Sequence, residues 1–235
     1  MRIMMTGSKG YLGTHIIKRM DDINSVHEIV EYEGEITEFF PLGDYDLVLH
    51  LAGLAGVRQS VETPDQYWKT NVEGSKCVFN WCEQRNTPVV YFSSSNAAEW
   101  WTNPYAMTKK ACEALAPSNA VGIRPSTVWP GREDMFYRKL ERGEVEYVNG
   151  GHYRDYIHID DFVDAAISIV DNWLRFQGKI VDIGTGKLVS VEALAYSMGY
   201  KGKVITDPTP NERASNAADT YLLRSVFKKK FKKII

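Results

Sequence analysis

Residues 2–20 read RIMMTGSKGYLGTHIIKRM, and this stretch decides the fold. A short apolar run from Ile3 to Met5 leads into three glycines, Gly7, Gly10 and Gly13, and apolar residues then recur at helical spacing. We therefore expect a strand, a tight glycine loop and a helix. Glycine permits positive φ and close backbone approach, and a helix N-terminus stabilises negative charge. The pattern predicts a binding site for the pyrophosphate of a dinucleotide.

An acidic residue follows at the spacing that such a site requires. A second apolar run, Ile29-Val30, ends at Glu31, eighteen residues after Gly13. A carboxylate there can accept hydrogen bonds from both hydroxyls of a ribose, and it repels the 2′-phosphate of NADP. We therefore expect NAD as the cofactor. The alternative is an ordinary strand-to-helix turn without a ligand, because three glycines alone are a weak signal.

Composition narrows the class of protein. A chain of 235 residues, 44% of them hydrophobic, can bury the core of one large domain or of one domain with a small lobe. The net charge of −2 and the isoelectric point near 6.2 give no reason to expect a nucleic acid as partner. The lysine-rich stretch at residues 228–233 is expected to be a solvated tail.

Cysteine and histidine usage predicts neither disulfides nor a metal site. Cys77, Cys82 and Cys112 form neither an even set nor a CxxC pair, so we expect reduced, packed thiols in a cytoplasmic protein. The five histidines are scattered without the spacing of metal ligands. No apolar run is long enough to span a bilayer, and the first residues predict a strand rather than a signal peptide. We expect no membrane partner.

The rest of the chain alternates between strand and helix patterns, which predicts an α/β fold. Strands are expected at residues 46–51, 89–92, 121–123, 146–148 and 179–183. Helices are expected at residues 64–84, broken only at Gly74, and at 105–115, 135–142, 160–176 and 189–198. The expected architecture is a Rossmann-type, doubly wound parallel sheet with a small C-terminal substrate-binding lobe.

We expect two domains. Residues 1–131 form the cofactor-binding Rossmann domain, to which the strand at 179–184 returns. Residues 132–178 and 185–235 form the small substrate-binding lobe, where the alternation of strands and helices is looser.

Three residues carry the strongest catalytic signal. Tyr105 and Lys109 are four residues apart on a predicted helix, so the ammonium can lie beside the phenol on one helix face. Positive charge there favours the phenolate and makes the tyrosine a usable acid and base. Ser95, at the end of the preceding strand, can hold a substrate hydroxyl or carbonyl for the proton transfer. Each residue alone is ordinary, but parallel-sheet topology brings them to the same edge as the glycine loop.

The motifs together resemble a known family. The sequence is similar to extended short-chain dehydrogenases/reductases of the NAD-dependent epimerase/dehydratase group, typified by UDP-galactose 4-epimerase. The resemblance covers almost the whole chain. It is carried by MMTGSKGYLG, LVLHLAGLAGVRQSVETPDQYWKTNVEG, VVYFSSS, NPYAMTKKACE, GIRPSTVWPGR, YRDYIHIDDFVDA and VDIGTGKLVSVEAL.

The resemblance assigns roles to individual residues. It implies that NAD is bound by Gly7, Gly10, Tyr11, Leu12, Gly13, Glu31, Glu35, Ile36, Leu51, Ala52, Gly53, Asn71, Ser93, Tyr105, Lys109 and Pro125. It implies that Ser95, Tyr105 and Lys109 are catalytic, and that Ser95, Asn96, Thr127 and Arg154 bind the substrate. Arg154 matches an arginine that pairs with a substrate diphosphate, and a guanidinium suits a phosphate. The alternative is an internal ion pair between Arg154 and Asp155.

The chain departs from the family pattern in its loops. Only three residues separate Glu31 from Glu35, which predicts a shallower, more open adenine pocket. Only nine separate Ser95 from Tyr105, and Ala98, Glu99 and Trp100 stand where relatives have Tyr-Gly. The family's arginine near the end of the chain is missing, because residues 208–212 read PTPNE and the next arginine is displaced past them.

These observations predict an NAD-dependent sugar-nucleotide epimerase or a related oxidoreductase. The family's 4,6-dehydratases have Thr-Asp-Glu where this chain has Ser95-Asn96-Ala97, so elimination of water is not expected. A catalytically silent NAD-binding sensor or scaffold stays an alternative, as does a one-way reductase of a keto-sugar or other carbonyl compound. The sequence gives neither the sugar nor the nucleotide.

Relatives usually dimerise through two helices of each subunit, here residues 64–84 and 105–115, so a homodimer is expected. Apolar side chains that could serve such an interface are Trp68, Val72, Cys77, Phe79 and Trp81. Packing of the same side chains against the sheet is the alternative.

Overall fold

A six-stranded, all-parallel sheet forms the centre of the computed structural model, which describes residues 1–206 and 210–235. The strands, in the order in which they lie across the sheet, are β2 (Glu28–Tyr32), β1 (Arg2–Thr6), β3 (Leu47–His50), β4 (Val89–Phe92), β5 (Val121–Pro125) and β9 (Ile180–Ile183). The order reverses between β1 and β3, which is the position where ligands bind in doubly wound sheets. The predicted fold class is confirmed.

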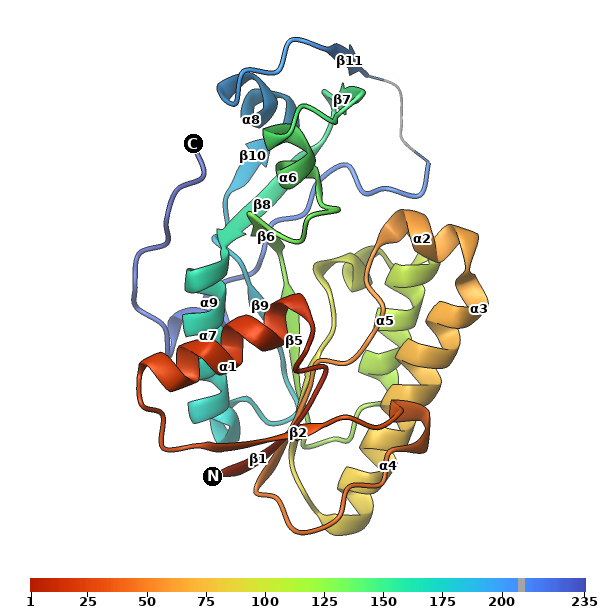
Figure 1. The fold of residues 1–235 in the computed structure, drawn as a ribbon, viewed down its shortest axis with the longest axis vertical. Helices are drawn as coiled ribbons and strands as arrows, with labels where there is room; N and C mark the ends of the chain where they lie inside the picture. Colours follow the sequence, from red (N-terminus) through yellow and green to blue (C-terminus); the bar gives the residue numbers. More distant parts are fainter. Residues whose placement is uncertain (207–209) are drawn as a thin grey trace.

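Helices cover both faces of this sheet, as Figure 1 shows. On one face lie α1 (Tyr11–Asp22), α7 (Ile159–Asp171), η4 (Trp173–Phe176) and α9 (Tyr221–Arg224). On the other lie η1 (Ile36–Glu38), η2 (Trp68–Gly74), α4 (Ser75–Arg85) and α5 (Pro104–Leu115). The expected helix at 160–176 is thus α7 followed by η4, and α7 packs against α1 and the sheet.

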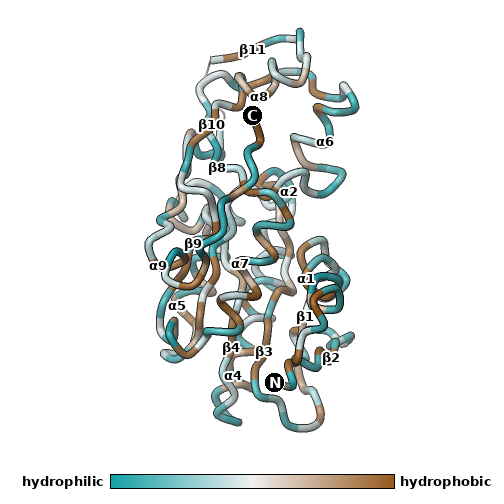
Figure 2. The backbone as a smooth tube through the Cα atoms, turned by 90° about the vertical axis from the view of Figure 1, so that its left-hand side faces the viewer, coloured by the Kyte–Doolittle hydropathy of each residue, from teal (hydrophilic) through white to brown (hydrophobic). Residues whose placement is uncertain are grey.

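Alternation along β1 explains how the sheet separates two cores. Ile3 and Met5 face the core beneath α1 and α7, whereas Met4 faces the core beneath α4. Each fully buried side chain of this size contributes about 1.5–3 kcal/mol to stability. Figure 2 shows hydrophobic residues running along the central strands, as a sheet buried on both faces requires.

The remaining elements gather at the carboxyl ends of the strands, at the top of Figure 1. A three-stranded sheet contains β10 (Leu188–Ser190), β8 (Tyr153–His158) and β6 (Thr127–Trp129), and a two-stranded one contains β11 (Lys203–Ile205) and β7 (Tyr147–Asn149). The associated helices are α6 (Phe136–Glu141) and α8 (Val191–Ser197). At these ends the chain leaves β3 and continues into α2 (Val57–Glu62) and α3 (Pro64–Tyr67), and it leaves β4 and continues into η3 (Ser95–Thr102).

The helix predicted at 64–84 differs from expectation at Gly74. It runs without a break as α3, η2 and α4, and η2 is a π-helical segment. A side chain at Gly74 would lie 2.6 Å from the Cδ1 atom of Ile36, so the glycine allows close packing rather than ending the helix. Val72, Phe79 and Trp81 are buried, which supports their interpretation as core residues.

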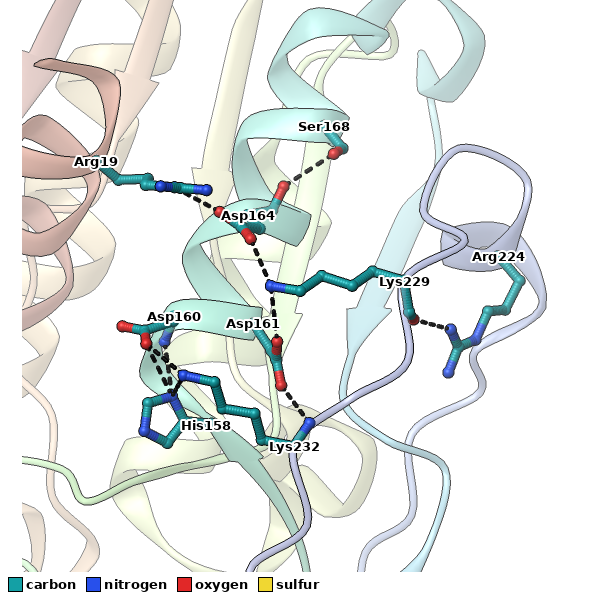
Figure 3. Close-up of polar contacts among 9 residues, drawn as sticks. All are labelled: Arg19, His158, Asp160, Asp161, Asp164, Ser168, Arg224, Lys229 and Lys232. Atoms are coloured by element: carbon teal, nitrogen blue, oxygen red, sulfur yellow. Dashed lines mark hydrogen bonds and ion pairs between the residues drawn. The ribbon is translucent and has the colours of Figure 1, made fainter. Parts of the chain in front are cut away.

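The five C-terminal lysines are exposed, as the predicted solvated tail requires, but two of them also form ion pairs with α7. Figure 3 shows these two, Lys229 and Lys232, beside α7, which carries Asp160, Asp161 and Asp164. Lys229 contacts Asp161 at 3.2 Å and Asp164 at 2.8 Å, and Lys232 contacts Asp160 at 2.6 Å. Asp161 is fully buried, so Lys229 compensates a carboxylate that water does not reach, whereas Asp160 is 59% exposed at its side chain.

Candidate active site

The glycine loop requires glycine for two different reasons. Gly7 has φ +72°, and a Cβ atom on it would lie 2.5 Å from the backbone nitrogen of Ala52. A Cβ atom on Gly13 would lie 2.4 Å from the carbonyl oxygen of Gly7. The backbone of the glycine loop therefore packs directly against the segment after β3 and against the first turn of α1.

The first turn of α1 is free to receive an anion. Gly10 precedes the helix and offers no side chain to its N–H groups, and the first turn holds no acidic residue. Unpaired N–H groups and the helix dipole together stabilise a pyrophosphate at this position. Tyr11 lies at the start of the helix, and its hydroxyl accepts a hydrogen bond from the backbone nitrogen of Gly131 at 3.2 Å. Leu12 follows and packs against the core beneath α1.

An open groove of about 330 Å³ runs beside the loop and ends at the predicted ribose acid. Its lining residues are Ser8, Lys9, Thr14, Ile17, Lys18, Asp21 and Glu31. Glu31 is exposed near the end of β2, and Lys9 pairs with Glu33 at 2.7 Å. Glu35 is exposed, whereas Ile36 is buried against Gly74. The groove thus offers a carboxylate to a ribose beside the glycine loop.

Buried polar contacts hold the segment Leu51-Ala52-Gly53 against the loop. The backbone nitrogen of Leu51 donates to the carbonyl oxygen of Thr6, and that of Ala52 donates to Thr6 Oγ1. The same hydroxyl lies 2.7 Å from His50 Nδ1. Complete burial lowers the pKa of His50 to about 3, so its ring is neutral at physiological pH.

The side chain of Asn71 in η2 forms hydrogen bonds with the segment after β3 and with α5. Its Oδ1 atom accepts from the backbone nitrogen of Leu54 at 2.7 Å, and its Nδ2 atom donates to the Leu54 carbonyl and to Thr108 Oγ1. It is 1% exposed. In this structure its amide therefore positions the segment after β3 against α5.

Lys109 brings a buried positive charge to the ends of β3 and β4. It is 7% exposed, and its Nζ atom donates to the carbonyl oxygen of Phe92 at 2.9 Å. A Cβ atom on Gly53 would lie 3.3 Å from the same nitrogen, so the lack of a side chain at Gly53 leaves room for it. The ammonium is fixed beside the predicted cofactor path.

Tyr105 lies one helical turn before Lys109. Asn103 caps α5 by accepting a hydrogen bond from the backbone nitrogen of Ala106 at 2.8 Å, and Pro104 begins the helix. The backbone nitrogen of Tyr105 donates to Ser60 Oγ, and its ring meets that of Tyr67 edge to face.

A cation that the sequence analysis missed lies near these rings. Arg132 is held by Asp134 at 2.9 and 3.0 Å. The hydrogen bonds that Arg132 donates to Asp134 raise the pKa of the guanidinium, and Tyr105 and Tyr67 contribute in the same direction. Local sequence spacing does not reveal this electrostatic interaction, because Arg132 is far along the chain from both tyrosines.

Ser95 opens η3 directly after β4, and its hydroxyl has a partner that the sequence analysis also missed. Ser95 Oγ accepts a hydrogen bond from Asn216 Nδ2 at 2.9 Å. The Oδ1 atom of Asn216 is buried and has no partner within the described parts of the chain. Neighbouring Asn96 turns back on Ser94, whose Oγ accepts from its backbone nitrogen at 3.2 Å. The serine hydroxyl is thus held while one amide oxygen beside it stays unpaired.

The buried hydroxyl of Ser93 takes part in an ion-pair cluster between β4, α5 and β5. Its hydroxyl donates to Glu113 at 2.7 Å, and Arg124 donates to both oxygens of the same carboxylate at 2.6 and 2.7 Å. Burial alone would raise the pKa of Glu113, but the hydrogen bonds from Arg124 and Ser93 hold it below its usual range. This ion pair fixes α5 against β5.

Pro125 and Thr127 lie where the central sheet passes into the smaller one. Pro125 pairs with Ile183 at the end of β5, and Thr127 begins β6 opposite Tyr156. Both therefore lie at the carboxyl edge of the sheet, the edge that also carries the glycine loop.

Arg154 and Asp155 have separate partners, which answers the alternative of an internal ion pair. Arg154 donates to the carbonyl oxygens of Tyr153 and Ala214 at 2.9 and 3.1 Å. Asp155 is fully buried and accepts from Thr185, from the Gly186 nitrogen and from the nitrogen of Ala218. Its carboxylate therefore builds the turn after β9.

A family model described as the NAD dependent epimerase/dehydratase family matches residues 3–184. The chain belongs to this family. UDP-glucuronate 4-epimerase 3 of Arabidopsis thaliana is 26% identical over 87% of this chain, and the chain spans only 62% of that relative's length. The family is NAD-dependent, which confirms NAD as the predicted cofactor. The glycine loop, the uncapped start of α1 and the carboxylate of Glu31 fit that cofactor.

Solved structures confirm the fold of this family. MoeE5 in complex with UDP-glucuronic acid and NAD superimposes with a TM-score of 0.83, 24% identity, and coverage of 99% of this chain and 94% of that one. TunA, an NAD-dependent NDP-hexosamine 5,6-dehydratase, gives a TM-score of 0.83, 21% identity, and coverage of 99% and 93%. A dehydratase thus shares this architecture.

Membrane-spanning helices and metal-binding clusters were sought in residues 1–206 and 210–235, which the structure describes. Within these ranges, no helix is long and apolar enough to cross a membrane. Nor do three or more His, Cys, Asp or Glu side chains there gather in a way that could hold a metal ion. Residues 207–209, which include part of the segment that replaces the family's arginine, lie outside the described residues.

Proposed function

We propose that this protein is an NAD-dependent sugar-nucleotide epimerase with Ser95, Tyr105 and Lys109 at its reactive centre. One observation supports it most: a buried ammonium, Lys109, is fixed at the carboxyl ends of two central strands, one helical turn from Tyr105. This is the edge where the family's cofactor would lie along the glycine loop. A buried cation beside a phenol favours transfer of a proton from that phenol.

Each residue has a defined task in this proposal. Tyr105 takes the proton from a sugar hydroxyl and later gives it back. Lys109 stabilises the phenolate form of Tyr105, which accepts this proton. Ser95, held by Asn216, orients the sugar oxygen for the transfer. Bound NAD supplies the acceptor and donor of the hydride.

The neighbourhood of Ser95 favours epimerisation over loss of water. Asn96 and Ala97 follow the serine where a dehydratase of this family has an acid and a base, and Ala97 is fully buried. The carboxylate of η3 belongs to Glu99, which pairs with Arg213 at 3.0 Å. Elimination across the sugar therefore lacks a free acid and base at these positions.

The substrate class follows from Arg154 and from the names of relatives. A guanidinium suits a diphosphate, and the Arabidopsis relative is named for UDP-glucuronate. The test is to incubate purified protein with UDP-glucuronate, UDP-glucose and GDP-hexoses, and to follow the epimer and reduced cofactor together. An epimerase gives epimer without net NADH. A one-way reductase would consume reduced cofactor stoichiometrically, and inertness across the panel would contradict the proposal.

We also propose a homodimer and two domains. Trp68 of η2 is 44% exposed, and Met107 and Leu115 of α5 are 43% and 44% exposed. These two segments therefore present apolar surface to solvent, which a second subunit could cover. Residues 1–131 with β9 would hold NAD, and the small sheets would bind the sugar nucleotide. Light scattering checks the first point, since a monomer at micromolar concentration would contradict it.

A further inference from the structure

The carboxylate of Glu212 lies among cations that come from two other segments. Its Oε1 atom accepts from Nε and Nη2 of Arg58, both at 3.2 Å. Its Oε2 atom lies 3.9 Å from Nη2 of Arg154 and 3.7 Å from Nδ1 of His152. A single carboxylate therefore bridges an arginine of α2 and an arginine of β8.

The two arginines differ in how well their charge is compensated. Arg58 is 70% exposed at its side chain, so water solvates it. Arg154 is 19% exposed, and burial lowers the pKa of its guanidinium. Its Nη1 atom donates to the carbonyl oxygens of Tyr153 and Ala214, and its Nη2 atom lies 3.3 Å from Nδ1 of His152. The carboxylate of Glu212 stays at a looser 3.9 Å from the same Nη2 atom. A buried guanidinium in this state binds an anion that approaches more closely.

The segment that carries Glu212 also reaches the proposed reactive centre. Arg213 donates to the carbonyl oxygen of Ser95, and Asn216 donates to the hydroxyl of the same serine. The bridge between Arg58 and Arg154 is therefore only a few residues along the chain from groups that hold Ser95. A ligand with an anionic part at the arginines could place its other end near this serine.

We propose that Arg58 and Arg154 form a two-arginine clamp for the diphosphate of the substrate, and that Glu212 closes this clamp until the diphosphate displaces it. Carboxylate and phosphate oxygens fit the same guanidinium fork, so they compete for it. The like charge of an incoming diphosphate repels Glu212. Arg58 then supplies a second arginine for the diphosphate, beside Arg154. The identity of the ligand as a sugar nucleotide rests on the proposed function.

The clamp predicts selectivity by charge. A ligand must offset the loss of the Glu212 contacts, so a diphosphate binds well and a single phosphate poorly. Removing the negative charge of Glu212 relieves this competition and tightens the binding of any diphosphate. Removing Arg58 weakens the binding of the diphosphate and also frees Glu212.

The test uses inorganic pyrophosphate as the probe and protein saturated with NAD, so that the glycine loop is occupied. Calorimetry compares the wild type with Glu212→Gln, Arg58→Gln and the control Glu144→Gln, which changes the same charge at an exposed pair with Arg142. We expect Glu212→Gln to tighten pyrophosphate binding about tenfold, and Arg58→Gln to weaken it about tenfold. Glu144→Gln should match the wild type.

The proposal is overturned if Glu212→Gln binds pyrophosphate as the wild type does, or more weakly. It is equally overturned if Arg58→Gln, an exposed substitution that the fold should tolerate, leaves the affinity unchanged. Failure of the proposed function shows differently. In that case the variants shift pyrophosphate binding as expected, but the wild type converts no sugar nucleotide.

Discussion

The ammonium nitrogen of Lys109 lies 2.9 Å from the carbonyl oxygen of Phe92, the last residue of β4. This contact joins a helix to the carboxyl end of a central strand. The positive charge of Lys109 therefore lies beside Gly53, in the segment that follows the adjacent strand β3. The relationship fixes where α5 presents Tyr105, one turn earlier.

Replacing Lys109 by methionine should remove this charge with little change in volume. We expect kcat/KM for the proposed substrate to fall about 100-fold, because a charged hydrogen-bonding group near the reacting atoms is lost. Steady-state kinetics with UDP-glucuronate and UDP-glucose checks this. Lys110→Met is the matched control, since Lys110 is the next residue and pairs with Glu113 at 3.2 Å. Equal losses in both variants would contradict the assigned role.

Asn216→Ala should lower kcat about tenfold without weakening NAD binding, because it removes the donor that orients the Ser95 hydroxyl. The readouts are turnover and the dissociation constant of NAD, measured on the same preparation. Ser215→Ala, an exposed neighbour on the same segment, should behave as the wild type. An unchanged kcat in Asn216→Ala would show that Ser95 needs no such partner.

Arg124→Met should destabilise the fold by about 3 kcal/mol, since it leaves the carboxylate of Glu113 buried without its main partner. Urea unfolding gives the free energy. Lys9→Met removes a fully exposed ion pair and should have no measurable effect. A loss as small as that of Lys9→Met would mean that water reaches Glu113 in solution.

The buried ring of His50 predicts a pH dependence of stability. Its pKa is about 3 in the fold and about 6.5 when unfolded, so between these values the unfolded chain binds the extra proton. Stability is therefore lost as the pH falls below about 6.5. The wild type should lose about 1.4 kcal/mol per pH unit more than His50→Gln, which cannot titrate. Parallel pH curves for the two proteins would contradict this.

The sequence predicted most of the central sheet because its signals are local. The glycine spacing, the apolar runs of β3 and β4, and the Asn103-Pro104 start of α5 are read within a few residues. Glu31, Tyr105 and Lys109 follow from the same kind of spacing.

Contacts between distant segments could not be predicted in this way. Asn216 meets Ser95 across 121 positions, and Glu212 meets Arg58 across 154. The ion pairs of Lys229 and Lys232 with the aspartates of α7 are of the same kind, because 65 and 72 positions separate the partners. The sequence predicted a helix break at Gly74, because a glycine weakens a helix and the contact that explains it, with Ile36, lies far away in the chain.

One measurement tests the central claim most directly: turnover and NAD affinity of Tyr105→Phe, compared side by side with the wild type. If Tyr105 transfers the proton, turnover should fall about 1000-fold, whereas NAD affinity should change by less than about tenfold. Turnover within about threefold of the wild type would contradict the account, because another group would then have to move the proton.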